Sequence, residues 1–260
     1  MTPFVFQLNE VFPILSKVPV VEAVLEIRAR ADENWSERHI CDALERQLPN
    51  LPVSSSVGMV SGQIEFPQGE DPRAHTKSMG WHGIEKKSVD GKEVVRFEAD
   101  AFNYNHLTPY PGWQAFIQSA MDTWRIHQGL ASITAIQRIG LRFINKISVP
   151  VAGLQLEDYF SSPPLEPKGL ILPFSGFLHR DNMVVPGTEY AVQIIRTLAP
   201  PPPEGSTEIQ LILDIDVSST MPWSGDTESL MKRLSEMRWL KNKAFFGSLG
   251  EKALQLLTSP

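Results

Sequence analysis

The chain has 260 residues, of which 42% are hydrophobic and 21% are charged, and its formal net charge is −6. These values are typical of a globular protein that is long enough to bury a sizeable core. The negative net charge excludes a general electrostatic attraction to nucleic acid or anionic membranes, although it allows a local basic patch.

The single cysteine, Cys41, rules out an internal disulfide and a cysteine-based zinc cluster. No base at a recognisable spacing accompanies it, so we expect an inert, buried thiol. The first residues lack the charged and apolar regions of a signal peptide, and no run reaches the roughly 18 apolar residues of a membrane span. The sequence therefore predicts a cytoplasmic protein without membrane contact.

The first half of the chain alternates between strand and helix patterns. Period-two alternation predicts strands, a 3.6-residue period predicts helices, and Asp90-Gly91 is a strong hairpin turn. Gly129 is the expected C-cap of the second helix. The expected elements are a strand at 21–30, a helix at 35–48, a strand at 56–67, a hairpin over 79–107 and a helix at 113–129.

The second half repeats this order. Its expected elements are a strand at 136–149, a short helix at 154–160, strands at 170–180, 188–198 and 207–218, and a C-terminal helix. That last helix follows from apolar residues at helical spacing between Leu230 and Ala244, and Gly247 is expected to end it. Ser248 and Glu251 then form a capping-box pattern for a final short helix.

This order predicts an α+β fold with largely antiparallel sheet, helices packed on one side and a C-terminal helix. It describes two similar β-α-β-β-β-α halves, 1–130 and 131–260, within one compact unit. No residue-level repeat accompanies the order, so duplication is inferred from the pattern alone. The halves would build either one long curved sheet or a closed, barrel-like sheet.

Charged residues of both signs gather on the outward faces of three predicted strands. They are Glu22, Glu26, Arg28, Arg138, Arg142, Lys146, Asp214 and Asp216. The simpler interpretation is cross-strand ion pairing, which adds only about 0.2–1 kcal/mol per pair. It requires no cofactor.

The alternative interpretation is a polar groove that binds a phosphorylated ligand. Arginine forks bind phosphate in bidentate fashion, and paired carboxylates suit magnesium. The candidate ligand-binding residues are Arg138, Arg142, Lys146, Arg28 and Arg196. The candidate magnesium ligands are Asp214, Asp216 and Glu26, with Glu22 beside them.

The paired acids loosely resemble those of the triphosphate-tunnel enzymes, which carry such pairs on an early and a late strand. The first strand of those enzymes alternates Glu-x-Glu-x-Lys, whereas this chain reads Glu22-Ala-Val-Leu-Glu26-Ile-Arg28. This departure weighs against a metal role for Glu22. The histidines form no zinc-binding helix pattern, and no nucleophile-elbow or nucleotide-loop motif is present.

An aromatic stretch, 103–113, contains Tyr104, Tyr110 and Trp113. Exposed aromatics of this kind can anchor a protein partner. They can also cap the core where a strand turns into a helix, and we favour this role because Trp113 begins the apolar helical face.

The C-terminal helix is basic. Its cations are Lys232, Arg233, Arg238, Lys241 and Lys243. Cations late in a helix complement its dipole, so a solvated face is expected. With a net acidic chain and no DNA-binding motif, nucleic acid is not an expected partner.

Five stretches in order resemble a sporadically distributed bacterial protein family of about this length without an assigned activity. They are "PVVEAVLEIRA", "QRIGLRFINKISVP" followed by "LEDYF", "LILDIDV" and "FFGSLGEKALQLL". The resemblance implies a bacterial cytoplasmic protein linked to mobile or defence loci, and it carries over no catalytic residue. The shared pattern includes Glu22, Glu26, Arg138, Arg142, Asn145, Asp214 and Asp216.

The sequence thus predicts a binding or interaction module that meets a protein partner or a second copy of itself, in a defence or toxin–antitoxin-like setting. The alternative is a metal-dependent enzyme that processes phosphate or nucleotides on the charged sheet face. The enzyme requires Arg138, Arg142 and the Asp214–Asp216 pair to converge on an accessible cavity.

Overall fold

Alternating apolar residues give a strand one face that must be buried, and the described residues form a sheet of nine strands whose central members alternate in this way. The computed structural model describes residues 4–32, 35–65, 71, 73–133, 135–165, 169, 172, 174–200, 205–220 and 226–259. The strands are β1 (Val20–Ala29), β2 (Val53–Glu65), β3 (Arg73–Lys87), β4 (Glu93–Glu98), β5 (Ala101–Leu107), β6 (Ile136–Pro150), β7 (Leu178–Val184), β8 (Tyr190–Leu198) and β9 (Glu208–Ser219).

The strands pair throughout in antiparallel fashion, in the order β2-β3-β4-β5-β1-β6-β9-β8-β7. The central pair is β1 with β6. Beyond β1 follow β5, β4, β3 and β2, and beyond β6 follow β9, β8 and β7, so both sides run in descending order but the first has one strand more. Within the described residues the sheet is open, with β2 and β7 at its ends, and it does not close into a barrel.

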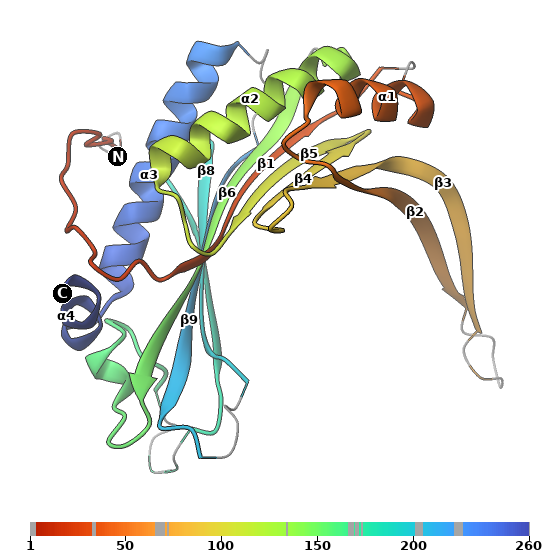
Figure 1. Ribbon diagram of the computed structural model, residues 1–260. Helices are drawn as coiled ribbons and strands as arrows, with labels where there is room; N and C mark the ends of the chain where they lie inside the picture. The colour runs from red at the N-terminus through yellow and green to blue at the C-terminus, as the bar shows by residue number, and fades with distance from the viewer. Residues whose placement is uncertain are drawn as a thin grey trace.

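The helices lie on one side of the sheet (Figure 1). They are α1 (Glu37–Gln47), α2 (Trp113–Ala131), α3 (Thr227–Ser248) and α4 (Glu251–Thr258), with a short 3₁₀ turn, η1 (Leu156–Asp158). Fully buried side chains such as Leu25, Phe143, Ile215 and Trp124 form the core between the sheet and these helices. The predicted α+β class with helices on one side is confirmed.

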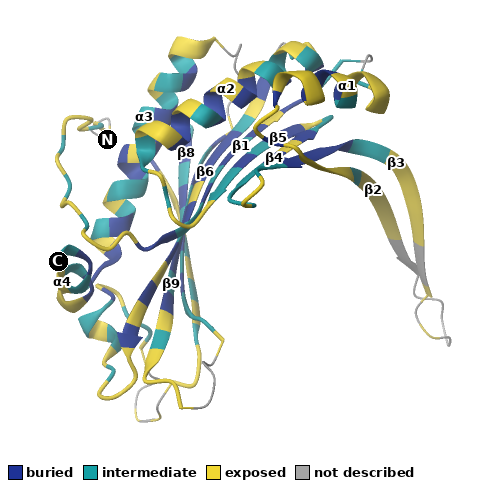
Figure 2. Cartoon of the chain, in the orientation of Figure 1, coloured by how far each residue is buried: buried dark blue, intermediate teal, exposed yellow. Residues whose placement is uncertain are grey.

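The hairpin of β2 and β3 reaches beyond the helices and is exposed along its outer part (Figures 1 and 2). The turn predicted at Asp90-Gly91 joins β3 to β4, and Gly91 takes the left-handed conformation there with φ of 70°. The sequence interpretation placed one hairpin over 79–107. The structure has three strands in that range, because β5 begins directly after β4 at Ala101.

Two predicted helix ends differ from the structure. Gly129 does not cap α2, because the helix continues to the buried Ala131 and ends at Ser132 with φ of 50°. Packing of the last turn against the core outweighs the preference of glycine for a helix end. Ser248 is the last residue of α3. Gly250, which has no side chain to cap a helix, holds the N-cap position before α4 begins at Glu251, so the capping box does not form.

The strand expected at 170–180 lies later, as β7 at Leu178–Val184. Residues 170, 171 and 173 of the expected range lie outside the described residues. None of the described helices combines the length and apolar character needed to cross a lipid bilayer.

Candidate functional site on the open sheet face

The face of the sheet that the helices leave open carries the charged residues predicted from strand alternation. Strand register brings them to the centre of the sheet, where the two halves meet. Glu26 on β1 lies directly opposite Gly140 on β6 and Asn103 on β5. Arg142 on β6 lies between Val24 on β1 and Asp216 on β9. The site therefore combines strands from both halves of the chain.

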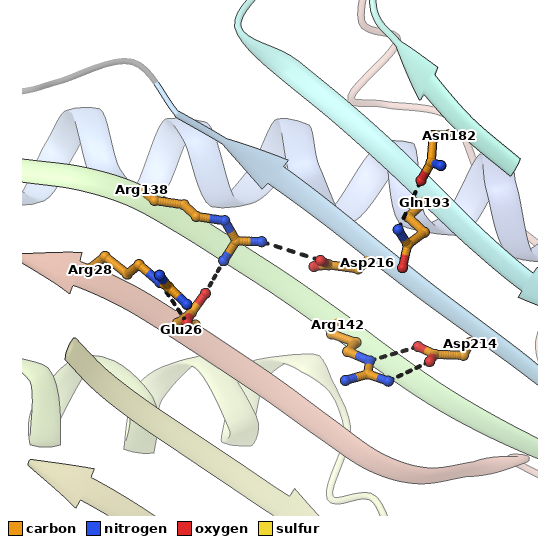
Figure 3. Close-up of polar contacts among 8 residues, drawn as sticks. All are labelled: Glu26, Arg28, Arg138, Arg142, Asn182, Gln193, Asp214 and Asp216. Atoms are coloured by element: carbon orange, nitrogen blue, oxygen red, sulfur yellow. Dashed lines mark hydrogen bonds and ion pairs between the residues drawn. The ribbon is translucent and has the colours of Figure 1, made fainter. Parts of the chain in front are cut away.

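Arg138 bridges the two strands that flank its own. Its Nη1 donates a hydrogen bond to Glu26 Oε2 on β1, and its Nη2 lies 3.3 Å from Asp216 Oδ2 on β9 (Figure 3). Arg28 Nε also donates to Glu26, at 3.0 Å from Oε1. The guanidinium of Arg138 is thus held on both sides by carboxylates.

Gly140 provides the space in which Arg138 lies. A Cβ added to this glycine would sit 2.6 Å from Nη1 and 3.3 Å from Cζ of Arg138. The guanidinium therefore packs directly over the glycine backbone. Any side chain at this position would displace the Arg138 head group from its carboxylate partners.

Arg142 forms a bidentate ion pair with Asp214. Its Nε is 2.8 Å from Oδ1 and its Nη2 is 2.5 Å from Oδ2 of that carboxylate (Figure 3). These hydrogen bonds raise the pKa of Arg142, against the opposing effect of burial. The Arg142 side chain is 47% exposed and that of Asp214 only 9%, so the arginine presents its outer edge to solvent.

A cavity of about 340 Å³, the sheet-face groove, opens among these residues. It is lined by Glu22, Val24, Glu26, Val94, Arg96, Asn103, Asn105, Arg138, Gly140, Arg142, Ile144 and Asp216. Asn105 Nδ2 donates to Glu22 Oε1 at 2.7 Å, and Arg96 Nε donates to Glu85 Oε2 at 2.7 Å. The polar side chains of the lining are therefore oriented by their neighbours.

The lining is balanced in charge, with three carboxylates and three guanidinium groups. Burial raises the pKa of Asp216, although the positive charges of Arg138 and Arg142 oppose this effect. The polar row continues toward the sheet edge, where Gln193 Nε2 donates to Asn182 Oδ1 at 2.8 Å (Figure 3).

Three of the predicted ligand-binding residues do not line this groove. Lys146 is exposed further along β6, and Arg28 lies at the margin with a side chain that is 59% exposed. Arg196 is 5% exposed and lies on the helix-facing side, since it shares the strand face of the buried Val192 and Ile194. There it binds Asp181 and the carbonyl oxygen of Ser162, so the interpretation that grouped it with Arg138 is wrong.

The carboxylates predicted as magnesium ligands face arginines. Asp214 is paired with Arg142, while Glu26 and Asp216 share Arg138. Across the part of the chain that the structure describes, no group of three or more His, Cys, Asp or Glu side chains is placed to hold a metal ion. The predicted set therefore does not form a ligand cluster.

The predicted aromatic patch is largely built into the core. Tyr104 is fully buried and its hydroxyl donates to Glu93 at 2.5 Å, so it is not available to a partner. Tyr110 and Trp113 are half-buried and pack against Phe116, which is also buried. This arrangement is the core-capping role favoured from the sequence.

No protein-family model matches the chain, and no curated protein matches it at a significant level. The geometry of the sheet-face groove is therefore the basis for assigning a function.

Seven residues of the groove lining were not singled out as candidates from the sequence. They are Val24, Val94, Arg96, Asn103, Asn105, Gly140 and Ile144. The available signal was the alternation of β4 and β5, which puts Arg96, Asn103 and Asn105 on the face opposite Phe97, Phe102 and Tyr104. Alternation alone does not reveal that β5 pairs with β1.

Proposed function

We propose that this is a binding protein whose sheet-face groove takes a small polar ligand bearing both a negative and a positive group. The observation that carries the proposal is the balance of three carboxylates and three guanidinium groups around an open groove of about 340 Å³. A pocket of this size suits a small molecule. The preoriented charges favour a ligand of complementary pattern.

The balance of charge argues against a polyanion such as a triphosphate. A polyphosphate in the groove would face Glu22, Glu26 and Asp216 as well as the arginines, and juxtaposed like charges are costly. A single carboxylate fits better at the exposed edge of Arg142. Glu22 contributes to the raised pKa of Arg142, so the two groups interact and offer adjacent sites for opposite charges.

Binding is favoured over covalent catalysis because the only potential nucleophiles in the described lining are carboxylates, and Glu26 and Asp216 are engaged by Arg138. Among the described residues, the groove wall includes no Ser, Thr, Cys, His, Lys or Tyr. A hydroxyl, thiol, imidazole or amine nucleophile is therefore missing from the described wall. The magnesium-dependent alternative has no ligand cluster among the same residues.

We further propose a bacterial, cytoplasmic setting, with a protein partner or a second copy of the chain and a link to a defence or toxin–antitoxin-like locus. The single cysteine supports the reducing compartment. The family resemblance supports the bacterial setting and the locus.

Thermal melts with small zwitterions, among them amino acids and dipeptides, test the proposed ligand class. At about 100 times its dissociation constant a ligand adds about 2.7 kcal/mol, which raises the midpoint of a chain this size by about 5–10 °C. Arg142→Ala is expected to abolish this shift, measured against its own unliganded melt. Inorganic phosphate, pyrophosphate and ATP, each with and without magnesium, form the second arm. A shift confined to that arm would overturn the zwitterion proposal and favour the phosphate alternative.

The variant Gly140→Ala is expected to weaken ligand binding in the groove while leaving the stability of the fold nearly unchanged. The three atoms nearest to the added methyl group all belong to the flexible end of Arg138, so the guanidinium moves and the strand stays. Because alanine is also favoured over glycine in a strand, unfolding free energy should change by less than about 1 kcal/mol. Ligand affinity should fall by about tenfold or more, since Arg138 leaves the groove wall. Calorimetric titration that finds wild-type affinity would exclude Arg138 from the site.

A further inference from the structure

A second cavity, of about 870 Å³, lies on the helix side of the sheet, away from the sheet-face groove. Its walls come from the N-terminal segment 8–20, the start of α2 and one side of α3, with Asn145 of β6 among the lining residues. In Figure 1 the N-terminal segment runs beside α3 toward α4 before entering β1. We call this space the strap cavity, and the segment 4–19 the strap.

The strap forms no helix or strand and is held by side-chain contacts. Phe12 stacks on Phe246 with ring centroids 5.4 Å apart. Glu10 accepts hydrogen bonds from Trp239 Nε1 at 2.8 Å and from Lys243 Nζ at 2.9 Å. Held by these contacts, the apolar side chains of the strap form one wall of the cavity beside α3, although the strap has no regular secondary structure.

The aromatic stretch and the basic helix seen in the sequence meet at this cavity. Arg238 on α3 lies with its Cζ 5.1 Å from the ring centre of Trp113, which begins α2. Lys241, about one turn later, has its Nζ 4.4 Å from the ring centre of Phe143. The strap cavity thus has an apolar wall with two cations at one end.

Neither cation has an acidic partner within ion-pair distance among the described residues. The one acid in the lining, Glu10, is already engaged by Lys243 and Trp239. Contact with an aromatic face compensates only part of the cost of removing an ammonium group from water. The pair Arg238 and Lys241 therefore lacks an anion.

The pKa of Lys241 is consistent with the lack of an anionic partner. Burial lowers the pKa of its ammonium group to about 7, and the positive charge of Arg238 adds to the effect. The negative charge of a bound anion would oppose both influences and stabilise the charged amine. Tyr110 and Asn145 also line the cavity and supply polar groups near this end.

We propose that the strap cavity binds an amphipathic carboxylate, a medium-chain or aromatic acid. The carboxylate pairs with Lys241 inside the cavity and with Arg238 at its mouth, and the apolar part of the ligand packs against the strap. A mostly apolar cavity with a few convergent polar groups is the usual form of a small-molecule site, and its volume falls within the usual range. This site is independent of the sheet-face groove.

Calorimetric titration of the full chain with decanoate and with 1-naphthoate tests the proposal, with decanol as the uncharged probe. Decanoate is expected to bind the wild type at least about tenfold more tightly than decanol. Lys241→Met should lower decanoate affinity by at least about tenfold and leave decanol affinity unchanged. Lys232→Met, the same change at an exposed position on α3, should leave both affinities unchanged.

Equal affinity for decanoate and decanol would overturn the charge-pairing proposal, as would unchanged decanoate affinity in Lys241→Met. Undetectable decanoate and 1-naphthoate binding by the wild type would overturn the site itself. Because Lys241→Met leaves every residue of the sheet-face groove in place, failure here is distinguishable from failure of the zwitterion proposal.

Discussion

Gly83→Ala is expected to lower the unfolding free energy by about 3 kcal/mol, near the upper end of the usual cost of overpacking. Gly83 is buried in β3, where β4 approaches it closely. A Cβ at this position would lie 2.2 Å from the carbonyl oxygen of Phe97 and 2.8 Å from Cα of Glu98. These are backbone atoms of a paired strand, so no side-chain rotation relieves the contact. Chemical denaturation should show the loss, with a thermal midpoint about 6–12 °C lower.

Gly129→Ala is the matched control. This glycine lies inside α2, and a Cβ there meets no atom within 4 Å. Alanine is favoured over glycine in a helix interior by up to about 1 kcal/mol, so this variant should be more stable than the wild type. A Gly83→Ala protein as stable as the wild type would show that the β3–β4 pairing tolerates a side chain there.

Strand alternation was enough to predict which charges share a face. Glu22, Glu26, Arg138 and Arg142 reach the open face because each alternates with buried apolar neighbours. The same rule, applied to β8, would have separated Arg196 from them, since Arg196 has the parity of Val192 and Ile194. An arginine on the helix-facing side is unusual because its charge must be satisfied internally, here by Asp181 and a carbonyl oxygen.

The alternation of apolar and polar residues in the sequence does not reveal which strands pair or which side chains pack closely together. The bridge from Glu26 through Arg138 to Asp216 depends on β1, β6 and β9 lying side by side. It also depends on Gly140 lacking a side chain, and a glycine within a strand pattern does not say which neighbour approaches it. Pairing of distant strands is set by the whole fold and not by local sequence.

The position of the sheet-face groove has a structural consequence. Its central ion pairs connect β1, from the first half of the sequence, to β6 and β9, from the second. Neither half alone contains the full set of carboxylate and guanidinium groups. A ligand in the groove would therefore contact both halves and stabilise their junction.

His127 on α2 is the clearest buried group that the proposed sites do not use. It is fully buried among aromatic rings, with centroids 5.3 Å from Trp35, 5.6 Å from Phe102 and 5.7 Å from Trp124. Neither ring nitrogen has a hydrogen-bond partner among the described residues. Burial lowers the pKa of His127 to about 3, so the imidazole stays neutral in the folded protein.

Acidification is therefore expected to destabilise the protein through His127. In the unfolded chain a histidine takes up a proton near pH 6.5, whereas the folded site resists it until about pH 3. The unfolded state binds more protons between these values, so unfolding free energy is unaffected above pH 6.5 and falls by about 1.4 kcal/mol per pH unit below it. The loss at pH 5 is about 2 kcal/mol, or about 4–8 °C in the thermal midpoint.

His127→Leu should flatten this slope, whatever its effect on stability at neutral pH. His39→Leu, at an exposed position on α1, should keep the wild-type slope and serves as the control. Comparing slopes removes the contribution of other titrating groups, including Asp216, whose raised pKa acts in the opposite direction in every variant. Parallel melting curves for wild type and His127→Leu from pH 7 to pH 4 would mean that the folded core admits the protonated imidazole. The aromatic rings around His127 would then admit water more readily than their packing indicates.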